Sequence, residues 1–316
     1  MPVYLVTGGA GFIGSNLVAA ILARGERVRV LDNFATGKRA NLAEFETQIE
    51  IIDGDLRDRN TVAQAVKDVD YVLHQAALGS VPRSLVDPHT THEVNATGTL
   101  NLLWAAKEAG IKRFVLASSS SVYGNTPTLP KEESMPSQPV SPYAVSKLAA
   151  ERYAMSFHAV YGLPAVALRY FNVFGPKQDP DSQYAAVIPR FISALMNGKP
   201  PVIYGDGEQS RDFTFIENVV AANLLACTAP AAAGHFMNIA CGERYSLNLL
   251  AQHLAEIMGK NLTPVYEPER AGDVKHSLAG IARATRLLEF APRIKFQEGL
   301  QRTVAWYLKS HPRRAT

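Results

Sequence analysis

A tyrosine, a lysine and a run of serines have the spacing of a proton-transfer centre. Tyr143 and Lys147 stand four residues apart, so on a helix they would share one face. A lysine ammonium beside a phenol is expected to lower the phenol's pKa, because a nearby positive charge favours the ionised form. Ser119, within the serine run 118–121, could hydrogen-bond the same oxygen. These side chains predict a tyrosine that acts as a base near neutral pH.

Tyr-x-x-x-Lys is common by chance, so its meaning depends on the elements that carry it. The chain opens with an apolar run at 3–7, the glycine-rich stretch GGAGFIG at 8–14 and a helical stretch at 15–24. Strand, glycine turn and helix together are the fingerprint of dinucleotide binding, in which backbone N–H groups and a helix N-terminus meet a pyrophosphate. The stretch 3–23 lacks charged residues, but its glycines and the missing basic segment argue against a membrane span or signal peptide.

The residue that ends the second predicted strand indicates which dinucleotide is bound. Asp32 follows the strand at 27–31, where a carboxylate accepts hydrogen bonds from ribose hydroxyls and repels a 2′-phosphate. Lys38 and Arg39 lie nearby and could instead bind a 2′-phosphate. Asp32 beside a phosphate would be unfavourable, so we expect NAD rather than NADP.

The alternation of strands and helices continues as far as residue 170. Further strands are predicted at 49–53, 70–74, 113–117 and 163–170, and further helices at 57–67, 88–110 and 143–162. This pattern predicts an α/β fold, a Rossmann-type doubly wound parallel sheet over residues 1–171. Residues 172–316 are expected to form a smaller C-terminal α/β substrate-binding region, part of which returns to the sheet. His74, at a strand end, is expected to be a packing residue.

Composition excludes several classes of function. The 316 residues carry a net charge of +3 and no long basic run, so nucleic acid is not an expected partner. Two cysteines, Cys227 and Cys241, form neither a disulfide framework nor a metal spacing, which is typical of a reducing cytoplasm. His89 and His92 stand three apart without further ligands at a suitable spacing, so no metal is expected.

The motifs taken together resemble the extended short-chain dehydrogenase/reductases. They are TGGAGFIG at 7–14, Asp32-Asn33, Ser119, Tyr143-x-x-x-Lys147 and LRYFNVFG at 168–175, and GDGEQSRDF at 205–213 resembles the segment that holds a diphosphate in the nucleotide-sugar members. Within that family the chain is similar to UDP-hexose 4-epimerases of the UDP-N-acetylglucosamine 4-epimerase subgroup, which form homodimers through two long helices.

The resemblance implies a reaction through a 4-keto sugar. NAD would be a transient hydride acceptor, Tyr143 would take the proton of the sugar 4-hydroxyl, Ser119 would hydrogen-bond that hydroxyl, and Lys147 would assist Tyr143 and bind the nicotinamide ribose. The keto sugar would turn about its pyrophosphate linkage, and hydride would return to the opposite face.

The resemblance also implies two sets of binding residues. Those for the cofactor are Gly8, Gly11, Phe12, Ile13, Gly14, Asp32, Asn33, Gly37, Asp55, Leu56, Gln75, Ala76, Ala77, Asn95, Tyr143, Lys147, Tyr170, Phe171 and Val173. Those for the UDP-sugar are Gly79, Ser80, Arg83, Ser119, Ser120, Ser121, Asn172, Gln178, Val187, Tyr204, Arg211, Arg270, Asp273 and Ser277. Paired arginines suit a diphosphate, although Arg211 could instead form a salt bridge with Asp212 or Glu208.

The choice of sugar depends on Ser277, seven residues after Arg270. In the family this position borders the sugar's C2 substituent, and a small side chain leaves room for an N-acetyl group. We therefore expect a UDP-N-acetylglucosamine 4-epimerase with residual action on UDP-glucose. Alternatives are a UDP-glucose/UDP-galactose 4-epimerase and a 4-epimerase of UDP-glucuronate or an N-acetyl-uronate, whose carboxylate Arg83 could meet.

Two more distant alternatives are disfavoured by particular residues. A 4,6-dehydratase needs an acid/base pair, typically Asp-Glu, where this chain has Ser121-Val122. An NAD-binding regulatory protein without catalytic activity would be expected to have lost Tyr143 or Lys147.

Overall fold

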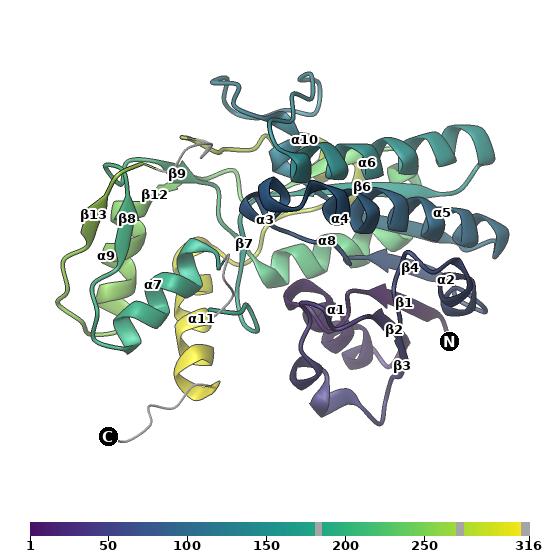
Figure 1. Cartoon of the computed structure of the whole chain (residues 1–316), viewed down its shortest axis with the longest axis horizontal. Coiled ribbons are helices and arrows are strands. Elements are labelled where there is room, and N and C mark those ends of the chain that lie inside the picture. The colour runs from purple at the N-terminus through teal and green to yellow at the C-terminus, as the bar shows by residue number, and fades with distance from the viewer. Residues whose placement is uncertain (181–184, 270–274, 311–316) are drawn as a thin grey trace.

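A seven-stranded parallel sheet lies in one half of the molecule, and most of the small C-terminal strands lie beside it in the other half (Figure 1). The computed structural model describes residues 1–180, 185–269 and 275–310. The strand order is β11-β6-β5-β4-β1-β2-β3, and all neighbouring strands run parallel. The strands are β1 (Val3–Thr7), β2 (Arg27–Asp32), β3 (Glu50–Asp53), β4 (Tyr71–His74), β5 (Arg113–Ser119), β6 (Ala165–Tyr170) and β11 (Phe236–Ile239). The predicted doubly wound parallel fold is confirmed.

Helices cover both faces of the sheet, as the alternation of side chains along each strand requires. Tyr4 and Val6 belong to a hydrophobic cluster on one face, and Leu5 to a second cluster on the other. The first face is covered by α1 (Phe12–Ala23) and α8 (Ile216–Thr228), and the second by α2 (Arg59–Ala65), α5 (Gly98–Glu108) and α6 (Pro142–Tyr161). Among the described residues, none of the helices has the length and apolarity needed to cross a membrane.

The predicted helix at 88–110 is interrupted by a wider turn. Helix α4 (Pro88–His92) leads into a π-helical turn, η3 (Glu93–Thr97), before α5 begins. Such turns are often found at functional sites. Helix α3 (Val81–Val86) was not predicted, because six residues give too little periodicity.

Helix α6 has clear start and stop signals. The Ser141 hydroxyl accepts a hydrogen bond from the Ala144 N–H at 3.2 Å, and Pro142 occupies the first turn. Gly162 ends the helix with φ of 72°, a left-handed conformation that glycine adopts easily. The cap therefore fixes Tyr143 in the first turn, next to the end of β5.

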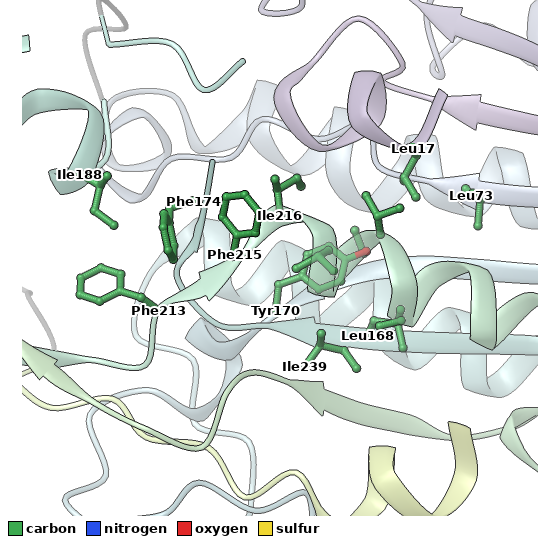
Figure 2. Close-up of a cluster of buried hydrophobic side chains, with 14 of the residues drawn as sticks. Leu17, Leu73, Leu168, Tyr170, Phe174, Ile188, Phe213, Phe215, Ile216 and Ile239 are labelled. Atoms are coloured by element: carbon green, nitrogen blue, oxygen red, sulfur yellow. The ribbon is translucent and has the colours of Figure 1, made fainter. Parts of the chain in front are cut away.

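The C-terminal region consists of small strand pairs and helices that continue the hydrophobic core of the sheet. Figure 2 shows Phe174, Phe213 and Phe215 beside Tyr170 and Ile216, in one cluster that also contains Leu17. Since this cluster crosses residue 171, and β11 and α8 pack with the sheet, the boundary between 171 and 172 stays a prediction. The remaining elements are β7 (Val173–Phe174), α7 (Val187–Met196), β8 (Val202–Tyr204), β9 (Ser210–Arg211), β10 (Thr214–Phe215), β12 (Tyr245–Ser246), α9 (Leu247–Ile257), β13 (Val265–Glu267), α10 (Ala282–Leu288) and α11 (Phe296–Ser310), with short 3-10 turns η1 (Arg39–Asn41), η2 (Ala43–Phe45), η4 (Ser120–Tyr123) and η5 (Pro230–Ala232).

Candidate active site

A cavity of about 740 Å³ lies at the carboxyl ends of β1 to β4. Its floor is the glycine-rich turn after β1. A side chain at Gly14 would place its Cβ 2.1 Å from the Gly8 carbonyl oxygen, and one at Gly8, where φ is 68°, would place its Cβ 2.7 Å from the Ala76 nitrogen. Only glycine fits these positions, so the backbone forms the close cradle that a pyrophosphate needs.

Most of the predicted cofactor residues line this cavity. They are Gly8, Gly11, Phe12, Ile13, Gly14, Asp32, Asn33, Gly37, Asp55, Leu56, Gln75, Ala76 and Ala77. Gly79 and Gln178, predicted for the substrate, line it as well. The sequence did not predict four further lining residues, Asn41, Arg57, Lys177 and Trp306. No local pattern marks any of them, and Lys177 and Trp306 approach from the C-terminal region.

The adenosine end of the cavity has the features of an NAD site. The Asp32 carboxylate accepts hydrogen bonds from the backbone N–H groups of Ala10 (2.9 Å) and Phe34 (2.8 Å), which hold it in place with lone pairs remaining for ribose hydroxyls. Burial raises its pKa. Lys38 forms an ion pair with Asp179 at 2.8 Å, and Arg39 forms one with an aspartate of β3. Both cations considered for a 2′-phosphate are thus engaged by carboxylates.

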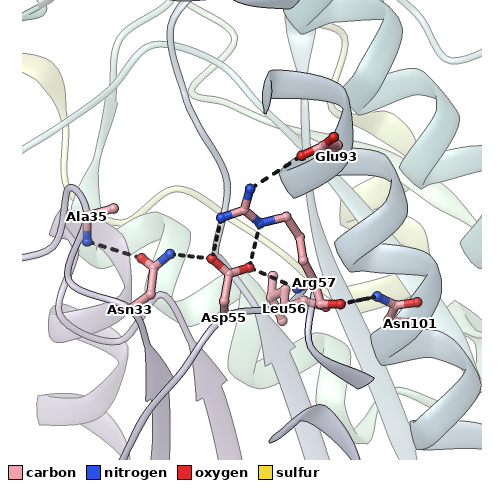
Figure 3. A network of polar contacts seen from close by, with 7 residues as sticks. All are labelled: Asn33, Ala35, Asp55, Leu56, Arg57, Glu93 and Asn101. Atoms are coloured by element: carbon pink, nitrogen blue, oxygen red, sulfur yellow. Dashed lines mark hydrogen bonds and ion pairs between the residues drawn. The ribbon is translucent and has the colours of Figure 1, made fainter. Parts of the chain in front are cut away.

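A polar network fixes the adjoining edge of the cavity (Figure 3). Two nitrogens of Arg57 donate to the two oxygens of Asp55, each at 2.9 Å, and Asn33 donates to the same carboxylate at 2.8 Å. The hydrogen bond from Arg57 lowers the pKa of Asp55 to about 2. Asn101 donates to the Leu56 carbonyl at 3.0 Å. Asp55 and Leu56, both predicted cofactor residues, are therefore held in place by side chains from other elements.

The serine run and Tyr143 come together at the end of β5. Ser119 Oγ accepts hydrogen bonds from the N–H of Ser121 at 3.2 Å and from its hydroxyl at 2.8 Å. Because Ser119 Oγ accepts both of these bonds, its own proton is available for Tyr143. The hydrogen bond between Ser119 and Tyr143 lowers the pKa of the phenol. Burial has the larger effect, so the pKa of Tyr143 is raised overall. The roles of Tyr143 as a base and of Lys147 as its electrostatic partner stay predictions.

Lys147 is a buried cation with one acidic neighbour. Burial lowers its pKa to about 8, and Glu151, one turn further along α6, opposes this shift. His74 is buried nearby, and burial together with Lys147 lowers its pKa to about 3. His74 is therefore neutral and structural, as expected from the sequence.

Asn95 does not line the cavity to which it was assigned. Its side chain is 1% exposed; its oxygen accepts from the Leu78 N–H at 2.7 Å, and its nitrogen donates to Ser146 Oγ at 3.0 Å. Asn95 therefore connects Leu78, which lines the cavity, to the residue before Lys147. The π turn places it there, a feature that the sequence pattern did not reveal.

Three residues of the 168–175 motif also lie elsewhere than predicted. Tyr170 is buried, and its hydroxyl lies 3.2 Å from the Gln75 side-chain oxygen, so it supports a cavity residue from behind. Phe171 is fully buried against Tyr123, with ring centroids 6.2 Å apart. Val173 lines a second cavity instead of the first.

This second cavity, of about 260 Å³, adjoins the first at Gln178, which lines both. Predicted substrate residues line it: Asn172, Gln178, Val187, Tyr204 and Arg211. Arg190, Gln209, Phe213 and Leu247 also line it but were not predicted. The Arg190 guanidinium carbon lies 5.4 Å from the centroid of the Tyr204 ring. Aromatic, apolar and cationic side chains together suit a nucleoside diphosphate.

Arg211 is held at the wall of this cavity by backbone oxygens. Its Nη1 donates to the carbonyls of Ser210 at 3.0 Å and Lys275 at 3.1 Å. The carboxylate of Asp212, considered as its ion-pair partner, accepts from the backbone N–H groups of Cys241 at 3.0 Å and Gly242 at 3.1 Å. The wall therefore orients Arg211 through the backbone.

Ser277 is brought to the substrate wall by the same β9 segment. Its N–H donates to the Ser210 carbonyl at 2.9 Å, and its hydroxyl accepts from the Asn172 amide at 3.4 Å. Two predicted substrate residues that are far apart in the sequence thus lie side by side. Arg270 and Asp273 fall outside the described residues.

Three other predicted sugar residues, Ser80, Ser120 and Ser121, belong to local helix starts or hydrogen bonds. Ser80 accepts from the Arg83 N–H at 3.1 Å and caps α3, and Ser120 begins η4. Ser121 is bound to Ser119, as described above. Ser118, the first residue of the serine run, donates to Glu151 at 2.7 Å.

Residues 4–240 match the NAD dependent epimerase/dehydratase family. The chain belongs to this family. Membership confirms the predicted family and NAD as its cofactor. The glycine cradle and the Asp32 carboxylate fit that cofactor, which Gly11, Asp32 and Gln75 would contact.

Three known proteins are similar to this chain over nearly their whole length. A UDP-N-acetylglucosamine 4-epimerase from Methanobrevibacter ruminantium, in complex with UDP-N-acetylmuramic acid, is 43% identical, with a TM-score of 0.93 over 98% of this chain and 99% of that chain. A Thermus thermophilus UDP-glucose 4-epimerase in complex with NAD is 38% identical, with a TM-score of 0.88 over 96% and 98%. A UDP-glucuronate 4-epimerase from Thermodesulfobacterium geofontis is 37% identical over 97% of this chain and 96% of its own.

Proposed function

We propose that the protein interconverts UDP-N-acetylglucosamine and UDP-N-acetylgalactosamine by epimerisation at C4. The relatives support 4-epimerisation of a UDP-sugar, and the observation that carries the choice of sugar is the small Ser277 beside Asn172. Bound NAD supplies a reversible hydride acceptor for the C4 hydrogen. The side chains of the protein would supply the proton transfer and the binding.

The proton would move between the sugar 4-hydroxyl and Tyr143. As the phenolate, Tyr143 takes the hydroxyl proton while the C4–H bond breaks with its electron pair, and a C4=O bond forms. Ser119, whose hydroxyl is oriented by Ser121, donates to the same oxygen. After the keto sugar turns, the electron pair and the proton return, and C4 has the opposite configuration. Lys147 would stabilise the phenolate electrostatically.

The nucleotide would occupy the second cavity. Arg211 faces the diphosphate, since a guanidinium makes paired, charge-assisted hydrogen bonds with phosphate oxygens. Tyr204 and Val187 border the uridine. Because Gln178 lines both cavities, the sugar would lie where they meet, between the diphosphate and the nicotinamide end.

The test of the sugar assignment is a pair of substitutions at Ser277. We expect Ser277→Tyr to remove turnover of UDP-N-acetylglucosamine and to retain turnover of UDP-glucose, because the phenol would occupy the space of the acetamido group. Ser277→Ala is the matched control, since it removes the bond from Asn172 but keeps the space. Undiminished N-acetyl turnover in the tyrosine variant would refute the assignment.

A uronic acid substrate is the second candidate, supported by the UDP-glucuronate 4-epimerase relative. Arg83 is the cation considered for a C6 carboxylate. It lies on α3, which begins two residues after Gly79, and Gly79 lines the dinucleotide cavity. Epimer separation after incubation with UDP-N-acetylglucosamine, UDP-glucose, UDP-glucuronate and the N-acetyl-uronate would distinguish the candidates. The first substrate should be turned over fastest.

We also propose a homodimer formed through α5 and α6. Apolar side chains on these helices face outward: Trp104 is 50% exposed, Tyr161 47% and Val160 67%. Exposed apolar groups of this size on adjacent helices suit a self-complementary interface. Light scattering should give twice the chain mass of 34.4 kDa; a monomer at micromolar concentration would contradict the proposal.

A further inference from the structure

Behind the catalytic helix lies a carboxylate that the proposed reaction does not use. Glu151 follows Tyr143 and Lys147 on α6 at steps of four residues, so the three side chains run along one side of the helix. Arg169 on β6 donates to both Glu151 oxygens, from Nη2 at 2.6 Å and from Nε at 2.8 Å. Both side chains have no exposed surface. The carboxylate is therefore fixed by a fully buried, two-point ion pair.

Glu151 also contacts the strand end that carries Ser119. The hydroxyl of Ser118, the preceding residue, donates to Glu151 Oε2 at 2.7 Å. The Arg169 guanidinium carbon in turn lies 4.7 Å from the centroid of the Tyr123 ring and 4.2 Å from that of the Phe236 ring. Helix α6 is thus tied to β5 and β6 at the level of the catalytic residues.

Stability alone is a weak explanation for this ion pair, because the desolvation of two charges offsets much of their attraction. Its position suggests a second role. Two titratable groups interact with Lys147 electrostatically: Glu151 on α6 and neutral His74 at the end of β4. Tyr143 lies one turn before Lys147 on the same helix. Arg169 on β6 lies on the far side of Glu151, paired with it. Glu151 therefore provides the negative charge that acts on the buried lysine.

We propose that Glu151 is a positioning residue for the catalytic dyad, which locks α6 against the ends of β5 and β6 and keeps Lys147 protonated as its counter-charge. The inference rests on the proposed function, because Tyr143 and Lys147 have their roles in that reaction.

Glu151→Gln tests the charge. Loss of the carboxylate lowers the pKa of Lys147 further, so the alkaline limb of the kcat–pH profile should move to lower pH. Two charges ~6 Å apart, at effective dielectric constants from about 80 to about 20, correspond to a shift of roughly 0.5 to 2 pH units. NMR titration of labelled lysine side chains should show the same displacement of the Lys147 midpoint. An unchanged limb and midpoint would overturn the proposal.

A second variant keeps the test decisive if Glu151→Gln does not fold, since a buried Arg169 without its carboxylate is strongly destabilising. Glu151→Leu combined with Arg169→Met removes both charges, a replacement that often preserves stability. We expect a melting temperature near that of the wild type, a kcat reduced at least about tenfold and a lower Lys147 midpoint. Wild-type kcat and midpoint in the folded double variant would show a purely structural role.

Ser118→Ala tests the hydrogen bond between Ser118 and Glu151 separately. It should lower kcat about tenfold with little change in KM, as expected for one hydrogen bond to a charged group; an unchanged kcat would contradict the positioning role. Arg302→Met, at an exposed ion pair with Glu217, is the matched control and should change neither parameter. If the wild type epimerises no UDP-sugar, the proposed function fails, whereas the Lys147 midpoint still tests Glu151.

Discussion

His74→Gln tests how a neutral histidine holds the cofactor side of the site together. His74 Nδ1 lies 2.6 Å from Thr7 Oγ1, and Nε2 lies 2.8 Å from Thr99 Oγ1. Thr99 donates its own proton to the Asn95 carbonyl at 2.6 Å. Nε2 must therefore carry the imidazole proton and donate, and Nδ1 must accept from Thr7. One neutral tautomer joins β1, β4 and α5, and a protonated ring would lose its acceptor nitrogen.

The magnitude follows from the pKa of His74, which burial lowers from 6.5 to about 3. Because the folded-state pKa is the lower one, the stabilisation is complete above about pH 6.5 and is lost as the pH falls toward 3. Each pH unit within this window changes the free energy of unfolding by about 1.4 kcal/mol. Between pH 7 and pH 5, His74 should thus lower the free energy of unfolding by about 2 kcal/mol.

Denaturant unfolding at pH 7 and pH 5 measures this contribution. In His74→Gln, which is neutral at both pH values, the fall in unfolding free energy should be smaller than in the wild type by about 2 kcal/mol. The constant cost of the altered hydrogen bonds cancels in that comparison. His89→Gln, at an exposed histidine, is the control and should retain the wild-type pH dependence. Equal pH dependence in His74→Gln and the wild type would refute the conclusion that a buried, neutral His74 joins Thr7 and Thr99.

Three further substitutions test the cofactor and diphosphate sites. Gly14→Ala should weaken NAD binding roughly 10- to 100-fold, because the new Cβ would lie 2.1 Å from the Gly8 carbonyl oxygen; Gly79→Ala, where a Cβ meets open space, should not, and calorimetric titration measures both. Asp32→Asn should lower the ratio of NAD to NADP affinity about tenfold, since the 2′-phosphate is no longer repelled; an unchanged ratio would show that Asp32 does not select the cofactor. Arg211→Met should raise KM roughly 10- to 100-fold for every UDP-sugar alike, and a sugar-dependent effect in steady-state assays would argue against a diphosphate role.

The features that the sequence predicted well are those encoded locally. The glycine turn, Asp32 at the end of β2, and the capped helix that carries Tyr143 each depend on neighbouring residues, and the structure has them at the predicted places. The succession of the first six strands along the chain follows from the alternation of strands and helices, whereas their order within the sheet was not predicted. The π turn within 88–110 and the short α3 were missed, because neither changes the helical pattern enough to be recognised.

Features that depend on long-range contacts could not be predicted from the pattern. Ser118 resembles an ordinary strand residue until Glu151 is placed 2.7 Å from it. Lys38 looked like a possible phosphate ligand, and its ion pair with Asp179 depends on how the C-terminal region packs over the dinucleotide cavity. Burial raises the pKa of Tyr143, and the surroundings of a side chain are likewise a property that residue spacing does not reveal.

The central claim is that hydride leaves C4 of a UDP-sugar and returns to the same carbon. The most direct measurement is incubation of the purified protein with UDP-N-acetylglucosamine deuterated at C4, followed by separation of the epimers and analysis of the label. We expect UDP-N-acetylgalactosamine that retains deuterium at C4. Loss of the deuterium to solvent, or no epimer from any UDP-sugar, would contradict the account.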